Sequence, residues 1–324
     1  MPHFITVPVN ENGIVFDPQI DVSIQTALQP PFAFQDVFVY SHGWSTNADT
    51  ALDEYGRFSI AFAKMLLLVD AGVFARPPRD TFGVGIHWPS EITEDPNSPL
   101  NYAQLFTFYT MEHRADGVGK NAVYTMLRLM MQAQPAVPLR FFLIGHSFGC
   151  RVMLAALQDL QADLVSTIPL ADGTEFYVAL LEPAMDQDNP DPGDIYGNVV
   201  QIPNLKILLT TSQLDTALGH WFPLAGSIAN LIHKGDTPTA LGFGGPTPAT
   251  ETAFGTHRAV TVDQNFTTTS LGPVDERLIT ADLTPLHQWR VDQGLWNGGM
   301  SGSHSDIDND QVRALLAGFF FGPP

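Results

Sequence analysis

Cysteine and basic residues are the scarcest features of this sequence. The chain of 324 residues has one cysteine, Cys150, so no disulfide can form within it. Lysine and arginine together number 15 against 34 acidic residues, which gives a formal net charge of −19. Because no basic cluster is available to neutralise phosphates, we expect neither a nucleic-acid partner nor binding to anionic membrane surfaces.

Long apolar runs are absent as well. The most apolar early segment, residues 60–75, contains Lys64 and Asp70, which favours a buried helix over a membrane span. The chain opens with MPHFITVPVNENG, a pattern typical of a strand and a turn and not of a charged leader. We therefore expect no integral membrane segment and a cytoplasmic location, with secretion after removal of a leader as the alternative.

Two further absences concern cofactors. The sequence has neither paired cysteines nor a His-x-x-x-His spacing, so we expect no metal. The glycine-rich stretch LGFGGP lacks a strand before it and a helix after it, which is the setting that a dinucleotide loop needs. We expect no cofactor.

Hydrophobic residues make up 44% of the chain and alternate between strand-like and helix-like patterns. Helix-like spacing is expected from the end of the first buried run, residues 36–43, to about residue 70. The same spacing recurs at residues 121–134, after Gly149 and in the terminal segment, where Asp308 or Asn309 is the expected N-cap. This alternation predicts an α/β fold with a mostly parallel central sheet and helices on both faces. Short buried runs predict strands at residues 36–43, 82–88, 140–145, 175–181, 204–212 and 257–263, the last of these being the final strand.

The length fits one large domain, and we expect a single domain over residues 1–324. Long loops over the carboxyl ends of the strands are expected at about 89–118 and 218–256. Such loops commonly form the walls or the lid of a pocket. These segments contain the aromatic-rich stretches NYAQLFTFYTMEH (Tyr102, Phe106, Phe108, Tyr109, Met111) and LGHWFPLAG (Trp221, Phe222), which line a pocket or pack on the body of the fold.

A reactive residue stands between two glycines in RFFLIGHSFGCRVMLAAL, residues 140–157. A buried apolar run precedes Ser147 and a helical pattern follows it, so a tight turn must join strand to helix. Such a turn holds its central residue in a strained conformation, while Gly145 and Gly149 leave room for close packing. Strain at a serine indicates function. Cys150, just inside the helix, is expected to be a small buried hydrophobic residue.

The pentapeptide GHSFG in this setting resembles the nucleophile elbow of the α/β-hydrolase superfamily. The resemblance extends from VFVYSHGW to the last helix and is greatest to serine-esterase-like members that carry HGW, WPS and HSDI signatures. It implies an α/β-hydrolase fold and a Ser–His–Asp/Glu triad in which Ser147 is the nucleophile. In this superfamily the acid follows the serine in the chain and the histidine follows the acid.

That order places the base among the late histidines. His304 stands in GGMSGSHSDIDNDQ, a loop of small residues before the terminal helix, where the superfamily carries its base. His287 is expected in an irregular stretch with no strand before it. By resemblance, His304 is the base, and the early His42 orients its loop.

Three carboxylates are candidates for the acid of the triad. Asp215 follows the strand LKILLTTS, which matches the usual position. Asp186 and Glu182 follow the preceding strand, and Asp186 is the next candidate. The same residues could instead cap helices or lie in solvent.

The resemblance also implies an oxyanion hole and a reaction. Its two backbone N–H groups are expected from Phe148, next to the nucleophile, and from Trp44 in the HGW turn, where Gly43 allows close approach. We expect a serine hydrolase that cleaves uncharged, partly apolar carboxylic esters through an acyl-enzyme. Peptidase, amidase, thioesterase, lactonase or acyltransferase chemistry with the same triad is the alternative, as is a catalytically silent binding protein of the same fold.

Overall fold

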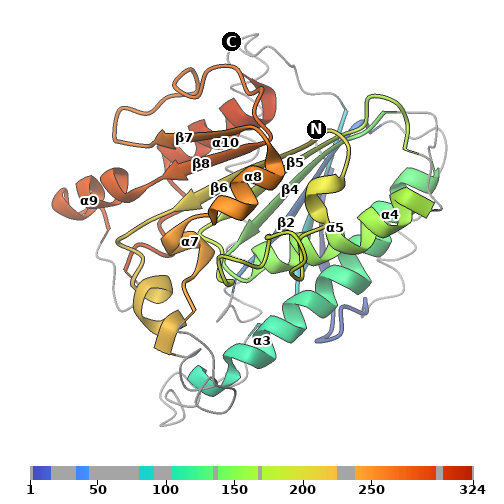
Figure 1. Cartoon of the computed structure of the whole chain (residues 1–324), viewed down its shortest axis with the longest axis horizontal. Coiled ribbons are helices and arrows are strands. Elements are labelled where there is room, and N and C mark those ends of the chain that lie inside the picture. Colours follow the sequence, from blue (N-terminus) through green and yellow to red (C-terminus); the bar gives the residue numbers. More distant parts are fainter. Residues whose placement is uncertain are drawn as a thin grey trace.

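The computed structural model describes residues 3–15, 34–43, 80–90, 104–133, 138–166, 170–224, 238–296 and 302–322. Within these residues the chain forms an α/β fold around one sheet of eight strands, and every strand pair in it is parallel (Figure 1). The order across the sheet is β1-β3-β2-β4-β5-β6-β8-β7. The strands are β1 (His3–Pro8), β2 (Asp36–Ser41), β3 (Thr81–His87), β4 (Arg140–His146), β5 (Glu175–Leu181), β6 (Leu205–Thr211), β7 (His257–Thr261) and β8 (Leu278–Asp282).

The helices cover both faces of this sheet. Helices α3 (Gln104–Val118) and α4 (Tyr124–Ala133), joined by a π-helical turn at Gly119–Val123, pack with α5 (Gly149–Ser166) (Figure 1). Helix α10 (Asp310–Phe321) packs on the other face. The shorter elements are a 3₁₀ turn at Val199–Gln201, a π-helical turn at Ala217–Trp221, α7 (Leu241–Gly244), α8 (Pro248–Phe254) and α9 (Thr284–Asp292).

The central strand β4 shows why the runs of the sequence are continuously apolar. Phe141 and Leu143 point into the core beneath α5, whereas Phe142 and Ile144 point into the core beneath α10. Since successive side chains of a strand point to opposite faces, a strand covered on both sides needs apolar residues at every position. All seven residues of β4 are buried.

The strand expected at the start of the chain is present as β1, and the six strands expected from the buried runs are present with ends that differ by up to two residues. Asn309 is the N-cap of α10 and accepts a hydrogen bond from the Val312 N–H at 2.9 Å. The helix expected to end near residue 70 lies outside the described residues. None of the helices in the described part of the chain is both long and apolar enough to cross a membrane.

Two expectations about the late chain were wrong. The strand at His257–Thr261 is not the last, because β8 follows it and lies between β6 and β7 in the sheet. His287 is not in an irregular stretch, because α9 begins two residues after β8 and buries this histidine completely. Pro285 does not interrupt the helix, because it occupies the first turn of α9, where its missing N–H has no helical partner to lose.

The two segments expected as long loops are partly helical. Residues 104–118 of the first form α3, and residues 91–103 lie outside the described part. The second contains the π-helical turn, α7 and α8, with residues 225–237 outside the described part. A wall or lid role for these segments stays a prediction.

Candidate active site

The candidate site lies at the carboxyl ends of three neighbouring strands. Ser147 follows β4, Glu182 follows β5, and Asp215 comes four residues after β6. Because β4, β5 and β6 are adjacent and parallel, the loops that leave them emerge side by side at one edge of the sheet. This arrangement brings together residues that are far apart in the sequence.

Ser147 sits on the sharp turn between β4 and α5. Its φ of 55° is in the left-handed region, which is strained for a residue with a side chain. The surrounding structure holds this conformation: the Ser147 N–H donates to the Leu181 carbonyl at 3.0 Å, and the Ser147 carbonyl accepts from the Ala184 N–H at 3.3 Å. The strain expected at this serine is therefore confirmed.

The flanking glycines allow the turn to pack closely. A Cβ at Gly149 would lie 2.1 Å from the Ser41 carbonyl oxygen, and one at Gly145 would lie 2.5 Å from the backbone of Gly149. Gly43 also lies close to the turn, since a Cβ added at this position would lie 2.6 Å from the Cβ of Ser147. The turn after β2 thus lies directly against the serine.

A continuous chain of hydrogen bonds links Ser147 to His304 and Asp215. His304 Nε2 lies 2.8 Å from Ser147 Oγ, and His304 Nδ1 lies 2.6 Å from Asp215 Oδ2. An ionised carboxylate can only accept, so Nδ1 carries the proton that is donated to Asp215, and Nε2 accepts from the serine hydroxyl. Asp215 is fully buried and Ser147 is 3% exposed, so the chain is largely shielded from water.

The loops of Asp215 and His304 are held together by backbone contacts. Asp215 and Gly302 form an antiparallel bridge, and the Ser303 N–H donates to the Leu214 carbonyl at 3.1 Å. Gly302 has a φ of 64°, and a Cβ there would lie 2.3 Å from the Leu214 carbonyl oxygen. Only glycine fits this approach, which fixes His304 two residues later.

Helix α9 supports the same loop from a second side. Arg290 donates to Asp306 at 2.6 Å, and the Asp306 N–H donates to the Ser303 carbonyl at 2.8 Å. His287 Nδ1 lies 2.9 Å from Ser212 Oγ, which in turn lies 3.1 Å from Ser303 Oγ. This network was missed in the sequence because α9 was not expected as a helix.

The other two candidate acids occupy different environments. Asp186 has no hydrogen bond to His304, and burial, with nearby Asp188, raises the pKa of Asp186 to about 6. Glu182 is fully buried, and neither carboxyl oxygen has a hydrogen-bond partner among the described residues. Burial first, and then the carboxylates of Asp215 and Asp306, raise the pKa of Glu182 well above its usual range. Of the three carboxylates, Asp215 alone contacts the histidine ring.

The pKa of Glu182 makes a prediction about stability. In the unfolded chain a glutamate ionises above about pH 4.3, whereas the raised pKa of Glu182 in the folded chain favours its uncharged form above that pH. The contribution of this carboxyl to the free energy of unfolding is therefore complete below that pH. It is lost as the pH rises toward the pKa of Glu182 in the folded chain, by at most about 1.4 kcal/mol per pH unit. A glutamine at this position does not ionise, so its contribution to stability does not depend on pH. Glu182→Gln should therefore gain thermal stability relative to wild type as the pH rises from 5.5 to 8 in metal-free buffer, and a pH-independent difference in Tm would contradict this.

Only one of the two expected oxyanion donors lies among the described residues. Phe148 is buried directly after Ser147, at the start of the turn into α5. Trp44 lies outside the described residues, one position beyond Gly43. His42 is fully buried; its Nδ1 donates to the Gly43 carbonyl at 2.8 Å, and its Nε2 accepts from the Trp88 N–H at 3.4 Å. These bonds hold the turn, as expected for His42.

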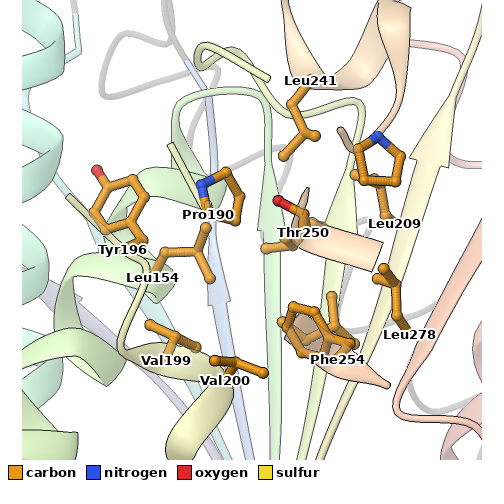
Figure 2. Close-up of a pocket in the computed structure, with 13 residues that line it drawn as sticks. Leu154, Pro190, Tyr196, Val199, Val200, Leu209, Leu241, Thr250, Phe254 and Leu278 are labelled. Atoms are coloured by element: carbon orange, nitrogen blue, oxygen red, sulfur yellow. The ribbon is translucent and has the colours of Figure 1, made fainter. Parts of the chain in front are cut away.

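An apolar pocket lies on the α5 side of the sheet. Its walls come from α5, α7, α8 and strands β5, β6 and β8 (Figure 2). Neither the serine, the histidine nor the aspartate lines it. The lining residues are Leu154, Leu180, Pro190, Tyr196, Val199, Val200, Ile207, Leu209, Leu241, Pro246, Thr250, Phe254 and Leu278.

Some residues of the aromatic segments expected as pocket walls are buried in the core, and others lie outside the part of the chain that the structure describes. Met111 and Phe222 are buried in the core beneath α5, and Trp221 is partly buried. Tyr102 lies outside the described residues, as do the side chains of Phe106, Phe108 and Tyr109. The aromatic lining of a substrate pocket therefore stays a prediction.

Three ionisable side chains that the sequence separates widely also meet here. His146, Glu182 and His304 each bring one nitrogen or oxygen atom to within 4.8 Å of the others. His146 Nε2 donates to the His304 carbonyl at 2.8 Å, and the two rings lie 5.1 Å apart. No spacing rule finds this cluster, because His146 ends β4, Glu182 follows β5 and His304 lies in the loop before α10.

Comparison with known proteins adds no assignment. No family model matches the chain, and the search of curated proteins returns no match. The functional argument therefore depends on the geometry of Ser147, His304 and Asp215.

Proposed function

We propose that this chain is a serine hydrolase of the α/β-hydrolase superfamily that cleaves carboxylic esters through an acyl-enzyme intermediate. The observation that carries the proposal is the hydrogen-bonded chain from Ser147 through His304 to the buried Asp215, with the serine on a strained strand-to-helix turn. A serine hydroxyl is a weak nucleophile without a base within hydrogen-bond reach, and that base needs a third group to orient it.

The reaction follows from these positions. Ser147 Oγ attacks the ester carbonyl carbon while its proton passes to His304 Nε2, and Asp215 stabilises the imidazolium that forms. The N–H groups of Phe148 and Trp44 are the proposed donors to the oxyanion. His304 then gives its proton to the departing alcohol, and water attacks the acyl-enzyme by the same route in reverse. Peptide, thioester, lactone or acyl-transfer chemistry would use the same groups.

A substrate panel tests the proposal. We expect p-nitrophenyl esters to be turned over faster than the matching p-nitroanilides and thioesters, with uncharged acyl groups preferred. Turnover of anilides or thioesters alone would move the activity to another acyl-transfer class. Failure with every substrate, together with no labelling by a fluorophosphonate, would indicate a silent binding protein.

Chelators and reductants supply a second test. Because the proposed chemistry uses neither a metal nor a thiol, EDTA and mild reductant should not lower the rate on the best ester by more than about twofold. Cys150 is buried, burial raises the pKa of its thiol well above the usual value, and the thiol donates to the Gly145 carbonyl at 3.1 Å. Activity that is lost with EDTA and restored by a divalent ion would contradict the mechanism.

A further inference from the structure

Glu182 is the least explained polar residue of the site. Its side chain is fully buried, both carboxyl oxygens lack a hydrogen-bond partner among the described residues, and its φ of 45° is strained. A buried carboxyl group without partners costs free energy. Such a residue needs an explanation, and a bound ion is one that the chemistry of a carboxylate allows.

The neighbours of Glu182 are suited to a transition-metal ion. His146 and His304 each bring one nitrogen to within 4.8 Å of a Glu182 oxygen and of each other. Two imidazoles and one carboxylate form a ligand set that zinc favours, whereas Mg²⁺ and Ca²⁺ prefer oxygen ligands. A cation here would also stabilise the ionised form of the carboxyl, which burial otherwise disfavours.

The distances require a small adjustment. Ligand atoms of a tetrahedral zinc ion lie about 3.4 Å apart, given metal–ligand bonds of about 2.0–2.2 Å. This is about 1.4 Å less than the 4.8 Å limit within which the three atoms already lie. His287 Nδ1, which is hydrogen-bonded to Ser212, lies 3.7 Å from Glu182 Oε1, so this ring borders the proposed site.

We propose that His146, Glu182 and His304 form an inhibitory zinc site. Both ring nitrogens of His304 are already hydrogen-bonded, Nδ1 to Asp215 and Nε2 to Ser147. A zinc ion must therefore displace one of these partners, and the loss of either one disables the base. Bound zinc switches the site off without any change in the fold. The inhibitory effect rests on the proposed hydrolase function, whereas the binding does not.

Direct binding is measured first. Chelator-treated protein is titrated with Zn²⁺ against a chromophoric chelator, with Mg²⁺ as the comparison ion. We expect one tight Zn²⁺ site per chain in wild type and in Ser147→Ala, and zinc affinity at least tenfold weaker in Glu182→Gln. Asp188→Asn is the matched control, because it removes one exposed carboxylate from the same protein and should bind zinc as wild type does. If Glu182→Gln does not fold, His146→Gln replaces it.

Inhibition is measured second, with each rate divided by that of the same variant without zinc. Zinc should inhibit wild type and Asp188→Asn at the concentration that fills the site, and should inhibit Glu182→Gln at a concentration at least tenfold higher. Equal zinc affinity in wild type and Glu182→Gln would overturn the site. A loss of zinc affinity in Asp188→Asn as large as that in Glu182→Gln would overturn it too. Zinc that binds through Glu182 but leaves ester turnover unchanged would overturn the inhibitory role. If no ester is turned over, the proposed function fails and the binding result still decides the site.

Discussion

Ser147→Ala is expected to leave a folded protein whose ester turnover falls by about 10⁵- to 10⁶-fold. The side chain offers little packing volume, and among the described residues its hydroxyl hydrogen bond is to His304. The left-handed backbone at this position is maintained by bonds from the main chain, which alanine keeps. All covalent chemistry of the proposed mechanism, in contrast, depends on the serine oxygen.

The measurement is the steady-state rate on the best ester, with circular dichroism and the Tm as controls for folding. A matched control is Ser270→Ala, which removes an exposed hydroxyl in the loop between β7 and β8 and should keep the wild-type rate. An alanine variant at 147 that retains more than about a tenth of the wild-type turnover would contradict the nucleophile assignment.

The second large effect is expected at Asp215. The isosteric amide in Asp215→Asn keeps the shape of the side chain but presents the wrong partner to His304 Nδ1, which is 2.6 Å away. In a serine protease this replacement costs about 10⁴ in kcat, because the histidine is held in the wrong tautomer. Asp215 Oδ1 also accepts from the Leu218 N–H, and the amide oxygen can keep that bond only by placing its nitrogen toward His304. We therefore expect a loss of about 10⁴-fold in a protein that remains folded.

Asp186→Asn is the matched control for this loss. Asp186 lies in the loop after β5 and has no hydrogen bond to His304, so its replacement should cost less than about tenfold. The reverse ranking would move the acid to the loop after β5 and leave the rest of the mechanism intact. Equal, small losses at both positions would favour Glu182, or a serine–histidine pair without a third member.

The sequence predicted the parts of the fold that depend on local patterns. The run Phe141–Ile144 is apolar at every position because β4 is buried on both faces, and this signal is independent of the rest of the chain. The turn at Ser147 was equally readable, because the glycines on either side permit close approaches that a Cβ would prevent. Asn309 as the N-cap of α10 is a third feature of this kind.

Other features depend on tertiary contacts and were not readable. Strand β8 has five residues and follows a turn-rich segment, and it is stabilised by its place between β6 and β7. Helix α9 is short and begins with a proline in its first turn, so its pattern resembled a loop. The sequence placed Glu182, Asp186 and Asp215 after strands, but only packing shows which of the three contacts the histidine.

The same limit applies to the buried cluster around Glu182. A glutamate after a strand is ordinary in a sequence. That its carboxyl has no hydrogen-bond partner among the described residues is visible only once β5, α9 and the His304 loop are packed together. The raised pKa of this carboxyl follows from that packing, through burial and the nearby Asp215 and Asp306. A spacing rule for metal ligands cannot find it, because its partners come from distant segments.

The central claim is that Ser147 is an activated nucleophile, and labelling with a fluorophosphonate followed by peptide mass spectrometry tests it most directly. We expect one adduct per chain, located on Ser147, with no adduct in Ser147→Ala and labelling that is strongly slowed in Asp215→Asn. A labelled residue other than Ser147, or wild-type protein that stays unlabelled while correctly folded, would contradict the account.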